Sequence, residues 1–121
     1  MKNSEKRAKE LHNLIQDEFK KRKITIAVGN TDSNFAIVGT SEKYMQKDVL
    51  NEIEENEVLA TPNQDKHAEE DIIEEADKRE VNVTEIGASR PICSDCEELI
   101  KQRNITAKTK FSGKLSRKRR T

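Results

Sequence analysis

The spacing of apolar residues changes partway through the first forty positions. Between residues 4 and 22, apolar side chains recur every three or four positions, which predicts an amphipathic helix with Ser4 as its N-cap. Residues 24–29 then alternate larger apolar side chains with smaller ones, which predicts a strand. Turn-forming residues at 30–34 separate this strand from a second apolar run at 35–39. The two runs together predict a β-hairpin.

Beyond the hairpin, helical and strand-like stretches alternate along the chain. The least regular stretch is 42–57, where Tyr44, Val49 and Ile53 would share one face of a helix. A better-defined helix follows a loop at 61–66, and Asp65 is its expected N-cap. The remaining expected elements are a strand at 81–88, a helix at 93–103 and a strand at 105–111.

This order of elements predicts an α/β protein, a three-layer-type α/β sandwich in which helices cover a mixed sheet of about four to five strands. The length of 121 residues suits one domain over residues 1–121. Only 32% of the residues are hydrophobic and 38% are charged, so the core must be small and a bound metal would add stability. No stretch is apolar enough for a transmembrane helix, and the charged N-terminus lacks the apolar region of a signal peptide.

The net charge of zero conceals two strongly charged stretches. Residues 48–80 contain 13 acidic residues against three basic ones, whereas residues 101–121 contain nine basic residues and no acidic ones. The basic stretch ends in a tail at 112–121 that includes Arg117, Lys118, Arg119 and Arg120. Such a tail either contacts a phosphate backbone or is simply solvated and disordered, and the composition leaves both readings open.

Two short motifs contain residue types that bind metals. His67 and Glu69 belong to an H-A-E triplet, and Cys93 and Cys96 form a C-x-x-C motif that begins 26 positions after His67. Two thiolates and one imidazole are a common ligand set for catalytic zinc, because they leave the fourth position to water. Cysteines three residues apart face one side of a helical turn, where the helix dipole favours thiolates. Each motif alone is weak evidence, since Glu69 could equally be one more solvent-facing carboxylate.

The combination of motifs is more specific. H-A-E followed by P-I-C-S-D-C is similar to the H-x-E and P-C-x-x-C signature of zinc-dependent deaminases. The chain therefore resembles the cytidine deaminase-like superfamily over about residues 4–111, and residues 87–93 are most similar to the compact deaminase domains of bacterial polymorphic toxins. The motif departs from the signature at Ile92, which separates Pro91 from Cys93. The chain also ends soon after its fourth expected strand, where relatives have a fifth.

The resemblance implies a zinc-dependent hydrolytic deaminase that acts on a nucleobase, cytosine before adenine, in nucleic acid or in a nucleotide. His67, Cys93 and Cys96 would hold Zn²⁺, and Glu69 would carry protons from water to the ring nitrogen and the leaving amine. Asn34, near the start of the second strand, is the candidate for substrate binding. The resemblance further implies a toxin effector domain, either cytoplasmic or delivered into a target cell, with an immunity protein as partner and no membrane association.

Two other functions are compatible with the same residues. The first is a domain with a structural zinc ion or a redox-active C-x-x-C motif and no catalysis, although structural zinc sites usually have four protein ligands. His12 is the only histidine besides His67, so a closed site would need it or a carboxylate as the fourth ligand. The second is a zinc-stabilised nucleic-acid-binding module that uses the basic tail. Loss of activity on Glu69→Gln with zinc retained would separate both from a deaminase.

Overall fold

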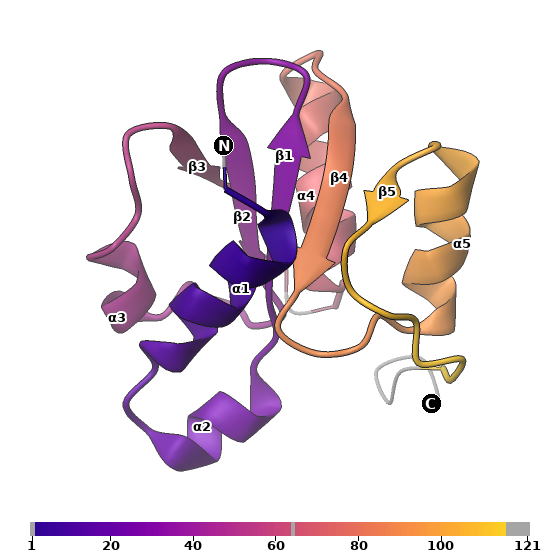
Figure 1. Ribbon diagram of the computed structural model, residues 1–121. Coiled ribbons are helices and arrows are strands. Elements are labelled where there is room, and N and C mark those ends of the chain that lie inside the picture. The colour runs from indigo at the N-terminus through magenta and orange to yellow at the C-terminus, as the bar shows by residue number, and fades with distance from the viewer. Residues whose placement is uncertain (1, 64, 116–121) are drawn as a thin grey trace.

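A computed structural model describes residues 2–63 and 65–115, which form an α/β fold around one mixed sheet (Figure 1). The elements in chain order are α1 (Ser4–Asn13), α2 (Glu18–Lys23), β1 (Ile26–Thr31), β2 (Ala36–Thr40), α3 (Lys47–Leu50), β3 (Glu57–Leu59), α4 (Ala68–Lys78), β4 (Val83–Ala88), α5 (Ser94–Gln102) and β5 (Thr106–Ala107). The predicted fold class, an α/β protein with a mixed sheet packed against helices, is confirmed.

The sheet has five strands in the order β3-β2-β1-β4-β5. The central strand β1 is antiparallel to both of its neighbours, β2 and β4. The two outer pairs, β2 with β3 and β4 with β5, are parallel. The β1–β2 pair is the predicted hairpin, in register from Ile26 opposite Thr40 to Asn30 opposite Ala36.

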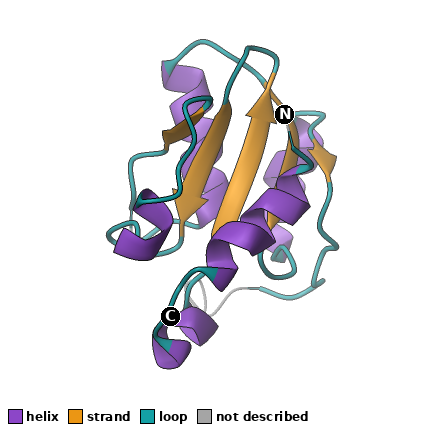
Figure 2. Cartoon of the chain, turned by 60° about the vertical axis from the view of Figure 1, so that its left-hand side comes forward, coloured by secondary structure: helices purple, strands orange, loops and turns teal. Residues whose placement is uncertain are grey.

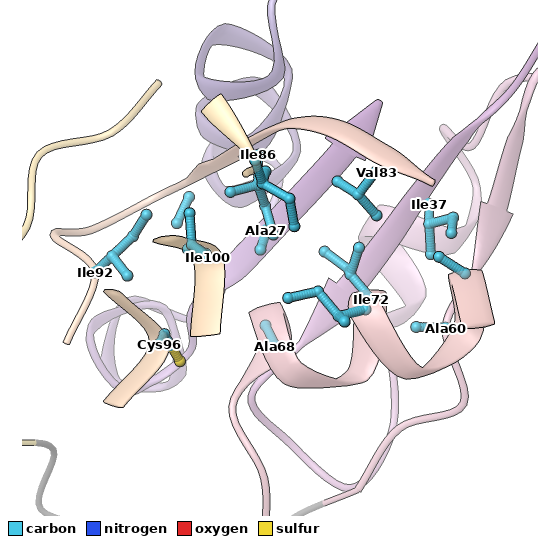
Figure 3. Close-up of a cluster of buried hydrophobic side chains, with 14 residues drawn as sticks. Ala27, Ile37, Ala60, Ala68, Ile72, Val83, Ile86, Ile92, Cys96 and Ile100 are labelled. Atoms are coloured by element: carbon cyan, nitrogen blue, oxygen red, sulfur yellow. The ribbon is translucent and has the colours of Figure 1, made fainter. Parts of the chain in front are cut away.

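Side chains of the hairpin alternate between two apolar cores, one on each face of the sheet. Ile26, Val28 and Val38 join the side chains of α1 in one core, whereas Ala27 and Ile37 join those of α4 in the other. Helices therefore cover both faces, as Figure 2 shows. The second core also extends beneath α5, and Figure 3 shows Ala68 and Cys96 reaching into it from α4 and α5. The helices α4 and α5 are thus anchored on the same face of the sheet.

Two glycines allow the helices to lie unusually close to the sheet. A Cβ atom at Gly39 would lie 2.7 Å from the carbonyl oxygen of Ala68, the first residue of α4. On the opposite face, a Cβ atom at Gly87 would lie 2.2 Å from the backbone nitrogen of Glu5 in α1. Gly39 therefore sets the position of the N-terminus of α4, where the H-A-E triplet begins.

The predicted first helix, residues 4–22, is two helices in the structure. Asn3 rather than Ser4 is the N-cap of α1, because its side chain accepts hydrogen bonds from the backbone N–H groups of Glu5 and Lys6. A new helix begins after Asp17, whose carboxylate accepts hydrogen bonds from Phe19 and Lys20 in the same way. These local caps end one helix and start another although the apolar spacing is continuous.

The predicted helix at 42–57 is wrong except for the single turn of α3. Tyr44 is 70% exposed, and only Val49 of the three expected inward residues is fully buried. Glu57 instead begins β3, where its buried carboxylate accepts hydrogen bonds from Arg7 Nε and Nη2 at 2.7 and 2.8 Å. A contact between residues 50 positions apart therefore overrides the local preference of this stretch.

The boundaries of the later elements also differ from the sequence expectations. His67, not Asp65, is the N-cap of α4, and Asp65 is exposed in the preceding turn. The strand expected at 105–111 is only the two-residue β5 plus an isolated bridge between Ile92 and Phe111. Arg117–Arg120 of the basic tail lie outside the described residues. Within those residues, no helix combines the length and the hydropathy needed to span a membrane.

Candidate metal and catalytic site

His67 owes its position to the start of α4. As N-cap it has an extended backbone, with φ −81° and ψ 155°, so its side chain leaves the helix in a different direction from those that follow. Its backbone N–H donates to Glu70 Oε1 at 3.1 Å, which fixes the first turn. Because His67 is not part of the regular helix, the two-residue spacing of H-A-E does not force His67 and Glu69 to opposite sides.

Cys93 and Cys96 occupy the start of α5 in an equivalent way. Cys93 is the N-cap, and Cys96 lies one turn further and is completely buried. The loop that contains Cys93 is held by the chain beyond β5: Ile92 N–H donates to the carbonyl of Lys110, and Ser94 N–H donates to that of Lys114. These bonds, at 2.9 and 3.0 Å, connect the C-x-x-C motif to a segment that the sequence pattern did not associate with it.

The structure brings the three predicted ligands together. One ligand atom each from His67, Cys93 and Cys96 lies within 4.8 Å of the others, and Cys93 Sγ is 3.7 Å from His67 Nδ1. Tetrahedral zinc with ordinary Zn–S and Zn–N bonds separates its ligand atoms by roughly 3.5–3.8 Å. Both thiols are free, so neither is lost to a disulfide. The chemistry and the spacing of these donors therefore fit a zinc ion.

The protonation of the site also suits a cation. A hydrogen bond from the Cys96 thiol, followed by one from the His67 ring, lowers the pKa of Cys93 to about 4. The same Cys93–Cys96 bond, together with burial, raises the pKa of Cys96. The hydrogen bond with Cys93 raises the pKa of His67. The triad thus combines a thiolate with protons that a divalent cation would displace.

Glu69 is a buried carboxylate beside the three ligands. It belongs to the first turn of α4, is only 4% exposed and contributes to the wall of a cleft. Burial raises its pKa, and a hydrogen bond from the backbone N–H of Glu69 itself, followed by the charge of His67, partly offsets the effect of burial. A buried carboxyl group with a raised pKa, placed beside the three candidate ligands, is the kind of group that serves as a general acid or base.

The cleft has a volume of about 560 Å³ and opens at the end of the sheet where β1 begins and β2 and β4 end. His67, Glu69 and Cys93 form part of its wall, together with Thr25, Ser41 and Glu42 from the strand ends. Volumes of roughly 300–1,000 Å³ are typical of small-molecule sites. The cleft can therefore hold a group the size of a nucleobase directly against the ligand triad.

Basic residues on the rim of this cleft were not anticipated from the sequence. Arg22 and Lys23, at the end of α2, face Arg90, which follows β4. Arg90 Nη2 donates to the carbonyl oxygens of Arg22 and Ile24 at 2.5 and 3.1 Å, which ties the two sides together. Arg90 stands three residues before Cys93, so its closeness to the motif was visible in the sequence. The positions of Arg22 and Lys23 were not visible there, because they depend on the separate helix α2.

Two sequence candidates lie elsewhere. Asn34 is exposed in the turn between β1 and β2, and it is not among the residues that line the cleft. His12 Nε2 lies 2.8 Å from the carbonyl oxygen of Lys21, between α1 and α2. Among residues 2–63 and 65–115, no fourth histidine, cysteine or carboxylate joins the His67–Cys93–Cys96 group. The group therefore has the three protein ligands typical of a catalytic zinc site and lacks the fourth of a structural one.

Comparisons of the chain with protein-family models, with curated proteins and with solved structures found no match. The geometry of the site and the two motifs that form it are therefore the basis on which a function can be assigned.

Proposed function

We propose that the protein is a zinc-dependent hydrolytic deaminase of nucleobases, with cytosine as the favoured base. One observation carries the proposal: a buried carboxylate, Glu69, adjoins a three-ligand zinc set at the wall of a cleft large enough for a base. The order of the residues in the chain, H-A-E and then P-I-C-S-D-C, supports the same chemistry.

His67, Cys93 and Cys96 would hold the metal, and the thiol hydrogen of Cys96 would be released on binding. When bound, zinc supplies a water nucleophile that is active at neutral pH. The start of both α4 and α5 at this point adds two positive helix-dipole ends, which stabilise the thiolates and any negative charge that develops on the substrate.

Glu69 would carry the protons. Hydrolytic deamination adds the oxygen of water to the ring carbon that bears the exocyclic amine, breaks the C–N bond and releases ammonia. The Glu69 carboxylate accepts the first proton of the water and passes it to the ring nitrogen; the second proton follows the same route to the leaving amine. Its buried position beside the ligands keeps bulk water away from these transfers.

The open ligand set favours catalysis over a purely structural zinc ion. A structural site would need a fourth donor, and the described residues bring none into the group. The proposal extends to a toxin effector domain, with an immunity protein as partner, because residues 87–93 resemble the deaminase domains of bacterial polymorphic toxins.

The test is an ammonia-release assay with zinc-loaded protein on single-stranded DNA, double-stranded DNA, RNA, free nucleotides and nucleosides. Sequencing or chromatography would identify C-to-U and A-to-I conversion. We expect conversion of cytosine in at least one of these substrates, loss of activity after zinc removal by a chelator, and recovery on readdition of zinc. Release of no ammonia from any substrate by fully zinc-loaded protein would contradict the proposal.

A further inference from the structure

A second hollow adjoins the cleft and shares part of its wall. It has a volume of about 350 Å³ and is lined by residues of α1, including Lys9, and by the segments around Pro91 and Lys110. Arg90 and Pro91 line both the hollow and the cleft, so the two are neighbouring sites that share part of their wall. The roles proposed for the ligands and Glu69 leave this hollow unused.

The walls of the hollow are fixed by hydrogen bonds. Ser89 exchanges two hydrogen bonds with Ile26: its N–H donates to the Ile26 carbonyl and its Oγ accepts from the Ile26 N–H. Thr109 Oγ1 accepts from Ala88 N–H at 2.8 Å and donates to the Ala88 carbonyl at 3.2 Å. The Ile92–Lys110 bond then holds Lys110 beside the β4–α5 connection. One of these bonds, Ile92–Lys110, also positions the C-x-x-C motif, so the hollow and the motif share part of their framework.

The charge of the hollow is positive. Lys9, Arg90 and Lys110 line it together with a single carboxylate, Glu5, which lies 3.5 Å from Lys9 Nζ. Among the described residues, Lys110 and Arg90 have no carboxylate partner within ion-pair distance. The basic rim continues into the cleft through Arg22 and Lys23. Two carboxylates, Glu42 and Glu69, also line the cleft, so the excess of cations is confined to its rim and to the hollow.

We infer that the hollow binds a backbone phosphate of a single-stranded polynucleotide whose target base occupies the cleft. The inference rests on the proposed deaminase function, and it adds a phosphate subsite made of Arg90, Lys110 and Lys9. A strand with one base in the cleft carries phosphates on both sides of that base. One of them would meet Arg22 and Lys23, and the other would meet Arg90 and Lys110. Lysine and arginine contacts of this kind fix the position of a strand without reading its sequence.

The experiment is equilibrium binding of the full chain to a fluorescein-labelled DNA strand of thymidines with one central cytidine. A length of about nine nucleotides lies within the range covered by small single-strand-binding domains. An RNA of the same sequence, cytidine 5′-monophosphate and polyglutamate serve as competitors. The test variant is Lys9→Gln with Lys110→Gln. The matched control is Lys6→Gln with Lys108→Gln, which removes two exposed cations that line neither the cleft nor the hollow.

We expect the test variant to bind the strand about three- to tenfold more weakly. The slope of log affinity against log salt concentration should become shallower by the amount that about one phosphate contact, or slightly more, contributes. The control variant should bind like the wild type. Unaltered strand affinity and salt dependence in the test variant would overturn the inference. Competition by polyglutamate as strong as competition by the RNA would also overturn it, because it would indicate an acidic protein partner instead. Because binding is measured without turnover, a failed deaminase assay and a failed binding assay remain distinguishable.

Discussion

Gly39→Ala is expected to damage the metal site through the position of α4. The added Cβ would lie 2.7 Å from the Ala68 carbonyl oxygen and 3.0 Å from Ile72 Cγ1. The nearer atom belongs to the backbone and cannot rotate away, so the start of α4 must move by about 0.7 Å to restore ordinary contact. Overpacking of this kind costs about 1–3 kcal/mol, which corresponds to a Tm lower by roughly 4–15 °C.

The same displacement should weaken zinc binding. His67 immediately precedes Ala68, so the imidazole moves with the helix while Cys93 and Cys96 remain on α5. We expect zinc affinity to fall by about tenfold or more, the usual effect of disturbing the contacts that orient a metal ligand. Competition with a chromophoric chelator measures the affinity, and urea unfolding measures the stability.

Gly87→Ala is the matched control for this prediction. Its Cβ would lie 2.2 Å from the Glu5 backbone nitrogen, so it should destabilise the protein by displacing α1, which carries no ligand. Zinc affinity should therefore remain close to that of the wild type. Equal zinc affinity in Gly39→Ala and wild type, or equal losses in the two variants, would refute the argument that Gly39 positions the site.

Two further predictions concern the ligands and the ion pair behind β3. Cys96→Ser should lose the single zinc ion bound per chain, measured by atomic absorption, and its Tm should no longer fall on chelation, whereas Ser94→Ala in the same turn should keep both properties. Burial favours the neutral form of Glu57, but Arg7 and the Glu54 N–H outweigh it and hold the pKa of Glu57 below its usual value. The stabilisation is complete above the unfolded pKa of about 4.3 and is lost as pH falls through the folded pKa, so Tm measured from about pH 6 to pH 3 should fall less steeply for Glu57→Gln than for wild type. Parallel curves for the two proteins would show that this carboxylate does not contribute to acid sensitivity.

The grouping of His67, Cys93 and Cys96 was predictable from sequence because each motif lies where a loop enters a helix. N-cap positions have extended backbone and exposed side-chain directions, and His67 and Cys93 both turn out to be N-caps. Their residue types and spacing are local properties of the chain. The hydrophobic pattern predicted a helix start at each motif, although it missed α2 and β3 elsewhere in the chain.

The rim of the cleft was not predictable in the same way. Arg22 and Lys23 reach it because Asp17 starts a new helix after the break at the end of α1, and continuous apolar spacing conceals this break. Likewise β3 depends on the pairing of Glu57 with Arg7, a contact between distant positions that no local pattern contains. Asn34 was assigned by its place relative to a strand, and the turn places it away from the cleft.

Turnover by Glu69→Gln decides whether Glu69 carries the protons of the reaction. Glutamine fills the same volume in the buried position and can still form hydrogen bonds, but it cannot accept and return a proton at neutral pH. The control is Glu74→Gln, an exposed glutamate on α4 that pairs with Lys66 at the surface.

We predict that Glu69→Gln lowers turnover by about 10² to 10⁴-fold, the usual contribution of general acid–base catalysis. The variant should retain one zinc ion and the wild-type circular dichroism spectrum. Glu74→Gln should keep full activity. Equal activity in the two variants, or loss of zinc from Glu69→Gln, would contradict the assignment of Glu69 as the proton carrier of a zinc-dependent deaminase.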